Sequence, residues 1–358
     1  MKSIENIEDA ENFEDMRNME NTRDKQKMNH MENLKNDIYP ERWVTPEGVL
    51  DEQQVTARQI LYQGLNSRCV ERFTVPSGQT YIFKPLTNPE QHGRERWMYE
   101  HVMAKLPPVY PQLIAVSDQT AAPEQSWMIY EDMGQLEHHL CESTILNAAA
   151  HMAAWHALPI AMWQELPRVG HKPPIRDMLH DLHQHQPVTA KLLSGLNLTL
   201  SAADWDKLTM LILTAEDELP QVLCHGDLHP GNVAEVEGRL VILDWEHAHL
   251  NTPLWDVYHL LDLSHPLFPR TMTPGLRARV MMLYLDKLES FDVQVERGSF
   301  AKWYDAYAIV FSLWMLRLID GDLRNPDCVW PQEQLRNQWH ETATTLEQCI
   351  EHLNGIRD

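Results

Sequence analysis

The alternation of apolar and polar positions divides the chain into a strand-rich first part and a helix-rich second part. Short apolar runs bounded by turn residues predict five strands, at 59–63, 69–75, 79–86, 113–116 and 126–131. Pro76-Ser77-Gly78 joins the second and third runs and is typical of a turn. Asp51 is placed to cap a short helix over 52–57, and apolar residues at spacings of three and four predict a longer helix over 94–105.

From about residue 136 onward the apolar positions follow a helical period. The alanine-rich segment 148–155 predicts a helix that stops near Pro159. Further helices are predicted over 204–217, 274–289, 300–318 and 331–353, with a short β-hairpin around Glu237-Gly238. Strands first and helices afterwards favour an α+β fold over a doubly wound sheet.

The composition of the first residues differs from that of the rest. Residues 1–37 are rich in acidic residues, Asn, Met and Lys and contain few aromatic or β-branched residues. Such a segment buries too little apolar surface to offset its ordering entropy, which predicts a disordered or partly helical tail. The predicted domains are therefore this tail, a small mixed lobe at 38–133, and a larger, mainly helical lobe at 134–358.

Charge and cysteine content narrow the classes of partner. Thirty Lys and Arg against 52 Asp and Glu give a net charge of −22, which disfavours nucleic acid and anionic membrane as partners. The five cysteines form no C-x-x-C pair, which argues against a zinc ribbon or a disulfide framework. No apolar run approaches the ~20 residues of a membrane span, and the N-terminus lacks a secretory signal pattern. We expect a cytoplasmic protein.

The strongest chemical signal lies in two short segments, each beside an apolar run. Asp227 and Asn232 are five positions apart after the run 222–224, and Asp244 ends the run 240–243. Phosphoryl transfer needs an acceptor for the hydroxyl proton and hard oxygen ligands that hold Mg²⁺ against the phosphates. The pattern predicts Asp227 as catalytic base and Asn232 and Asp244 as Mg²⁺ ligands. A turn or helix-capping aspartate would explain Asp227 alone, but not the full pattern.

A second set of residues is expected to bind the nucleotide. Lys84 lies on the third predicted strand, where a lysine is often merely exposed. Glu95 begins the following helix and could pair with Lys84 to orient the phosphates, with Glu100 as the competing carboxylate. Ser67 lies on a loop with a single glycine, Gly64, which makes it a weak phosphate-binding signal.

Three further groups of residues give weaker signals. Glu131 and Met133 fall where the two lobes should join, so their backbone groups could bind adenine. His225 and His229 are four apart, but Gly and Pro in the segment disfavour a helical zinc site, and His225 is expected to brace the loop. Core packing is expected for the late aromatic residues, some of which could form an acceptor pocket with Asp305, Asp320 and Asp322 that suits a cationic amine or sugar. These aromatic residues are Trp303, Tyr304, Tyr307, Trp314 and Trp330.

These segments resemble the aminoglycoside phosphotransferase and choline kinase-like family. The likeness lies in CHGDLHPGNV (224–233), VILDWEHA (241–248) and PLWDVYHLL (253–261), with supporting matches in YIFKPL (81–86) and GRERWMYEHVMAKLP (93–107). It implies a bilobal protein-kinase-like fold, ATP and Mg²⁺ as cofactors, and phosphorylation of hydroxyl groups on small molecules.

Position by position, the resemblance implies the same roles for the predicted residues. Asp227 matches the catalytic aspartate, Asn232 and Asp244 match the metal ligands, and Lys84 and Glu95 match the nucleotide-orienting pair. It also implies that Asp256 braces the catalytic region.

The predicted function is an ATP- and Mg²⁺-dependent phosphotransferase that acts on a hydroxyl of a small molecule, such as an aminoglycoside, choline or an amino or sugar alcohol. One alternative is a catalytically silent, kinase-like binding or structural protein such as a spore-coat component. The residues predicted for catalysis, Mg²⁺ binding and nucleotide orientation are all present, which favours activity. A kinase acting on protein side chains is disfavoured because nothing resembles an activation segment ending in A-P-E.

Overall fold

The computed structural model describes residues 40–64 and 66–355. The predicted acidic tail, 1–37, lies outside the described residues. The described residues form two compact units, one with 40–64, 66–85 and Ile114–Ile129, the other with Leu86–Leu113 and 130–355. We predicted continuous domains, whereas residues 86–113 group with the helical unit because α2 (Arg94–His101) packs against Trp245–His247. The assignment of a nucleotide-binding and a catalytic lobe stays a prediction.

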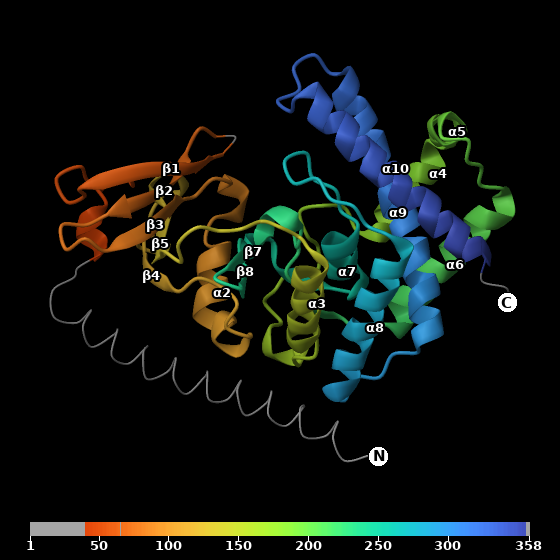
Figure 1. Cartoon of the computed structure of the whole chain (residues 1–358), viewed down its shortest axis with the longest axis horizontal. Helices are drawn as coiled ribbons and strands as arrows, with labels where there is room; N and C mark the ends of the chain where they lie inside the picture. Colours follow the sequence, from red (N-terminus) through yellow and green to blue (C-terminus); the bar gives the residue numbers. More distant parts are fainter. Residues whose placement is uncertain (1–39, 65, 356–358) are drawn as a thin grey trace. The chain divides into compact units, whose positions relative to one another are not determined.

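The first unit is built on a five-stranded sheet with the order β1-β2-β3-β5-β4 (Figure 1). The strands are β1 (Ala57–Gln63), β2 (Cys69–Thr74), β3 (Thr80–Pro85), β4 (Leu113–Val116) and β5 (Trp127–Glu131), close to the predicted runs. β1, β2 and β3 form an antiparallel meander. The predicted turn between β2 and β3 is confirmed, since the Val75 amide donates to the Gln79 carbonyl at 2.9 Å.

Alternate residues of β2 and β3 bury one face of this sheet. Phe73 pairs with Tyr81 across the two strands, and both side chains are buried. Trp43 covers them, with its ring centroid 4.8 Å from that of Tyr81. The period-two pattern that predicts these strands is therefore the pattern of a sheet with one apolar face.

The helix predicted over 52–57 is wrong. Asp51 instead closes a tight turn, because its side chain accepts a hydrogen bond from the Gln53 amide at 2.9 Å and its carbonyl accepts one from Gln54 at 3.0 Å. An aspartate that bonds the backbone two positions later stabilises a turn as readily as a helix start. β1 begins at Ala57, which pairs with Thr74.

The second unit is mainly helical. Beside α2 it contains α3 (Glu142–His156), α4 (Ile175–Gln184), α5 (Gln186–Gly195), α6 (Ala202–Glu218), α7 (Leu254–Leu261), α8 (Pro274–Ser290), α9 (Arg297–Arg324) and α10 (Gln332–Gly355). α10 packs along α9 and α3 packs along α8 (Figure 1). The prediction missed α7 because all eight of its residues are buried, so no polar face marks a helical period. Among the described residues, no helix has both the length and the apolarity needed to cross a bilayer.

Two pairs of short strands carry the chemically important loops. The predicted hairpin is confirmed as β7 (Val233–Val236) and β8 (Arg239–Ile242). Its two-residue turn, Glu237-Gly238, has positive φ at both positions, which matches the twist of the flanking strands. β6 (Val222–Cys224) pairs with β9 (His249–Asn251), a strand too short to be predicted.

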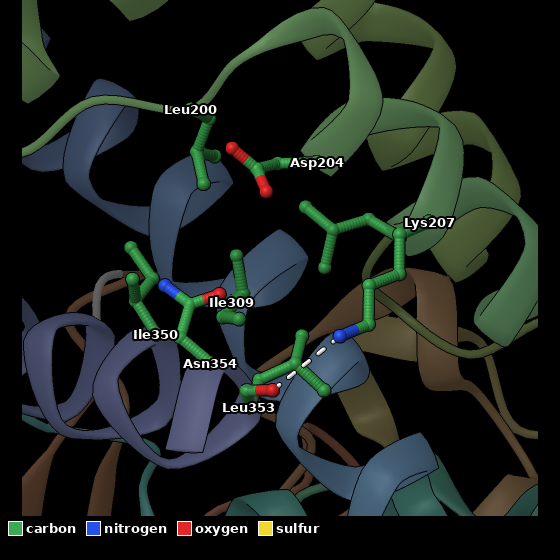
Figure 2. A pocket seen from close by; sticks show the side chains of 8 residues that line it. Leu200, Asp204, Lys207, Ile309, Ile350, Leu353 and Asn354 are labelled. Atoms are coloured by element: carbon green, nitrogen blue, oxygen red, sulfur yellow. Dashed lines mark hydrogen bonds between the residues drawn. The ribbon is translucent and has the colours of Figure 1, made fainter. Parts of the chain in front are cut away.

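A small cavity lies among α6, α9 and α10, and none of its lining residues belongs to the motifs (Figure 2). It is lined by Leu200, Asp204, Lys207, Leu208, Ile309, Ile350, Leu353 and Asn354. Its volume of about 10 Å³ is the space of roughly one water molecule. We therefore assign it no substrate.

Candidate active site

The loop that carries Asp227 is held by a buried carboxylate behind it. Asp256, on α7, is 0% exposed, and its two oxygens accept hydrogen bonds from the backbone amides of His225, at 2.7 Å, and Gly226, at 3.1 Å. The predicted bracing role of Asp256 is thereby confirmed. His156 on α3 lies 3.3 Å from the same carboxylate. Burial alone would raise the pKa of Asp256, but His156 and the backbone donor lower it to about 2.

Replacing Asp256 with alanine is expected to destabilise the fold. The change leaves two buried N–H groups and His156 without their acceptor, which costs about 3–5 kcal/mol of unfolding free energy. Urea denaturation followed by circular dichroism measures the loss. Asp206→Ala, at an exposed position on α6, is the matched control and should change stability by less than about 0.5 kcal/mol. Equal, small losses in both variants would contradict the bracing role.

Gly226 is needed at its position for two reasons. Its φ is +91°, and a Cβ built there would lie 2.0 Å from the His247 carbonyl oxygen. Its own carbonyl accepts a hydrogen bond from the Trp255 indole at 2.8 Å. Because Gly226 has no side chain, the loop after β6 can pack directly against the His247 carbonyl, in the segment after β8.

His225 links the same two segments through its ring. Nδ1 accepts a hydrogen bond from the Asp227 amide at 3.2 Å, so the proton is on Nε2, which donates to the Leu243 carbonyl at 2.8 Å. The prediction that His225 braces the loop is confirmed. Because both ring nitrogens are engaged, His225 is not a zinc ligand in this arrangement.

The three residues predicted for phosphoryl transfer come from segments that are bonded to each other. The Asn232 side-chain amide donates to the Asp227 carbonyl at 2.9 Å, and the Asn232 carbonyl accepts from the Leu243 amide at 2.9 Å. The second bond extends the β7–β8 ladder by one pair, so Asn232 and Asp244 lie at the same end of the hairpin. Because Nδ2 is the donor, the Asn232 side-chain oxygen is the atom left to act as a ligand.

Carboxylates gather at this end of the hairpin. One oxygen each of Glu95, Asp244 and Glu246 lies within 4.8 Å of the others. Asp244 has a left-handed backbone, with φ 63°. Burial, together with Glu95, raises the pKa of the Tyr130 hydroxyl well above its usual value, which places Tyr130 beside this cluster. Three hard oxygen donors in this small volume fit a divalent cation such as Mg²⁺.

The Asp227 carboxylate has neighbours that the sequence does not predict. Its Oδ1 lies 3.0 Å from the Lys172 ammonium and 3.4 Å from His171 Nε2, and its Oδ2 lies 3.5 Å from His229 Nε2. Burial would raise the pKa of Asp227, but the Lys172 ammonium and a hydrogen bond from His171 hold it well below its usual value. Burial also lowers the pKa of His229 to about 3 and that of His247 to about 4, so both imidazoles are neutral at pH 7. Asp227 is therefore an ionised carboxylate with a single strong cationic partner.

The other predicted nucleotide-binding residues are distributed over both units. Lys84 on β3 and Ser67, with φ 65° before β2, belong to the first unit, whereas Glu95 belongs to the second. The Lys84–Glu95 pair therefore stays a prediction. Glu131 uses its side chain locally, because Oε1 accepts from the Gln112 amide at 2.8 Å. Met133 is half-buried two residues later.

Asp305 is predicted as a candidate residue of an acidic acceptor pocket, and the structure contradicts this prediction. Asp305 is 2% exposed and its carboxylate is bound by His352 Nδ1 at 2.6 Å. Burial raises the pKa of Asp305 to about 6, although His352 opposes this rise. The expected core packing is confirmed for Trp303, Tyr304 and Tyr307, which are all buried.

Comparison with known proteins connects this geometry to a family. The model of the phosphotransferase enzyme family matches residues 77–291, more than half of the chain. The match includes Lys84, Glu95, Asp227, Asn232 and Asp244. Protein LicA of Haemophilus influenzae strain Rd is 35% identical over 63 residues, which are 17% of this chain and 24% of that protein. The chain thus matches about a quarter of the length of this curated relative.

Two solved structures have a similar fold at low sequence identity. An aminoglycoside phosphotransferase from Alicyclobacillus acidocaldarius has a TM-score of 0.51 at 12% identity, covering 89% of this chain and 98% of that one. A choline/ethanolamine kinase family protein from Mesorhizobium loti has a TM-score of 0.50 at 18% identity, covering 84% and 91%. The predicted kinase-like α+β fold is confirmed. As its motifs predict, the chain belongs to the phosphotransferase enzyme family.

Proposed function

We propose that this protein transfers the γ-phosphoryl group of ATP to a hydroxyl of a small molecule. One observation carries the proposal: the Asn232 amide bonds the Asp227 carbonyl and the Asn232 backbone bonds Leu243, next to Asp244. These bonds link the segments of the three residues for which we propose roles in phosphoryl transfer, within a chain that matches a phosphotransferase family.

Asp227 orients the acceptor and receives its proton. In the proposed reaction the acceptor oxygen forms a bond to the γ-phosphorus, and the bond from that phosphorus to the β–γ bridging oxygen breaks. ADP leaves and the hydroxyl proton passes to Asp227. Lys172 and the hydrogen bond from His171 keep Asp227 ionised, so it can accept a hydrogen bond from the hydroxyl at neutral pH. A carboxylate of such low pKa takes the proton late, after the phosphoryl group has largely moved.

Asn232 and Asp244 are the proposed Mg²⁺ ligands. The donor set fits, because the Asn232 amide oxygen and the Asp244 carboxylate are hard oxygen ligands, and the Glu95 and Glu246 carboxylates lie beside Asp244. When bound, Mg²⁺ neutralises charge on the phosphates. The hydrogen bond to the Asp227 carbonyl holds the Asn232 side chain in place.

The nucleotide-binding residues are proposed on the family pattern. Lys84 would contact the phosphates and be oriented by Glu95, and Ser67 with its neighbouring backbone would cover the phosphates. The backbone of Glu131 and Met133 would bind adenine. The five cysteines are all free thiols, which suits the reducing cytoplasm where we expect the protein to work.

The acceptor is proposed as a small molecule with a hydroxyl group. The two structures with a similar fold are named for aminoglycosides and for choline or ethanolamine, which makes amino alcohols and amino sugars the first compounds to test. A cationic acceptor is compatible with the carboxylates of the site.

Two measurements on the purified full chain test the function. Mg-ATP should raise the melting temperature by mass action, and one of a panel of aminoglycosides, macrolides, choline, ethanolamine and sugar alcohols should accelerate ADP release. A melting temperature that Mg-ATP leaves unchanged, with no ADP released, would favour the catalytically silent alternative.

A further inference from the structure

Lys172 makes a specific contact that the phosphotransferase motifs do not include. Its ammonium lies 3.0 Å from Asp227 Oδ1, and it also contacts the ring of His171. The side chains of Lys172 and Asp227 are only 17% and 18% exposed. A charged lysine this far from solvent depends on its carboxylate partner, so the contact is more than a surface ion pair.

The segment that carries Lys172 is held on both sides. Before it, the Pro167 carbonyl accepts a hydrogen bond from Leu250, and Gly170 packs so closely on His249 that a Cβ would lie 2.7 Å from its ring. The His171 ring lies 4.2 Å from that of His247. After it, Pro173-Pro174 limits backbone freedom and leads directly into α4, which packs on α9. The position of the ammonium is therefore set by the fold.

The two oxygens of Asp227 have different surroundings as a result. Lys172 and His171 both face Oδ1, whereas Oδ2 lies 3.5 Å from His229 Nε2, beyond a good hydrogen bond. A carboxylate tethered through one oxygen has a defined rotation about its side-chain bond. Oδ2 is then the oxygen that can accept a hydrogen bond from a substrate hydroxyl.

We propose that Lys172 is a positioning residue of the phosphotransfer reaction: it anchors Asp227 through Oδ1, so that Oδ2 is presented to the hydroxyl of the acceptor. The inference rests on the proposed function and adds a residue to it. Lys172 also balances the charge of the Asp227 carboxylate locally, at 3.0 Å from Oδ1. The ammonium acts through Asp227 and does not bind the nucleotide.

Lys172→Met tests this role because methionine keeps the length and the apolar stem of the side chain but not its charge. Since the acceptor is unidentified, the probe is slow ADP release from Mg-ATP with water as acceptor. We expect kcat to fall on the order of 10–100-fold, the loss of one charge-assisted hydrogen bond, while the KM for Mg-ATP stays within about twofold. Lys172→Arg should recover most of kcat, because its guanidinium also donates to a carboxylate.

A matched lysine serves as control. Lys207 is half-buried on α6, and its ammonium donates to the Leu353 carbonyl at 3.4 Å rather than to a carboxylate (Figure 2). Lys207→Met should leave kcat unchanged. An unchanged or faster Lys172→Met, beside an active wild type, would overturn the positioning role while the proposed function stands. A Lys172→Arg variant as slow as Lys172→Met, with an unchanged melting temperature, would also overturn it. A wild type that releases no ADP with water or with any acceptor of the panel, and whose melting temperature Mg-ATP leaves unchanged, would overturn the proposed function, and the inference with it.

Discussion

Replacing Asp227 with asparagine is expected to lower kcat by about 10²–10⁴-fold, the usual contribution of a positioned acid–base group. Asparagine keeps the shape of the side chain, and the backbone bonds of residue 227 to His225 and Asn232 do not involve the carboxylate. The loop should therefore stay in place, and the Mg-ATP-dependent rise in melting temperature should be retained. Steady-state ADP release with the best acceptor from the panel measures the effect.

The Asp227 variant also separates a catalytic from a structural role. Loss of turnover together with loss of the melting-temperature rise would mean that Asp227 supports nucleotide binding or folding instead. Full turnover in Asp227→Asn would remove it from the catalytic role altogether. A double variant with Lys172→Met should be no slower than Asp227→Asn alone, because Lys172 acts through the carboxylate.

Asp244→Asn is expected to weaken Mg²⁺ binding by at least about 10–100-fold, the loss that follows even from replacing an outer partner of a metal ligand. Asparagine is the appropriate substitution because Asp244 has φ 63°, a left-handed conformation that asparagine tolerates and alanine does not. Turnover should fall at low Mg²⁺ and recover partly as the Mg²⁺ concentration is raised. Titration of ADP release with Mg²⁺ at fixed ATP gives the apparent affinity.

The chain provides a close control for this change. Asp292 has the same φ of 63° but is exposed after α8, so Asp292→Asn makes the same chemical change in the same backbone conformation outside the site. Its Mg²⁺ dependence should equal that of the wild type. An Asp244→Asn variant that also behaves as wild type would exclude Asp244 as a metal ligand.

The elements near the site could be predicted where local sequence determines local structure. The β7–β8 hairpin follows from two apolar runs around Glu237-Gly238, and this turn places Asn232 and Asp244 at one end by register alone. His225 is predicted to brace the loop, and its hydrogen bond to the Leu243 carbonyl does so. The bracing role of Asp256 is implied only by the family resemblance, and its hydrogen bonds to the same loop confirm it.

Contacts between distant segments could not be predicted. Lys172 lies 55 positions before Asp227 in a proline-containing loop, and nothing in that loop distinguishes it from a surface lysine. Asp305 was considered for an acceptor pocket because of the aromatic residues around it, but the face of α9 on which it lies is buried. The helix predicted after Asp51 failed for a related reason, since pairing of Ala57 with Thr74 outweighs a weak local helix signal.

A crystal structure of the full chain with Mg²⁺ and a non-hydrolysable ATP analogue tests the central claim most directly. We predict an ion bound by the Asn232 side-chain oxygen and the Asp244 carboxylate, with Asp227 oriented toward the γ-phosphate and still bonded to Lys172. An ion held by other residues, or a nucleotide bound away from Asp227, would contradict the account.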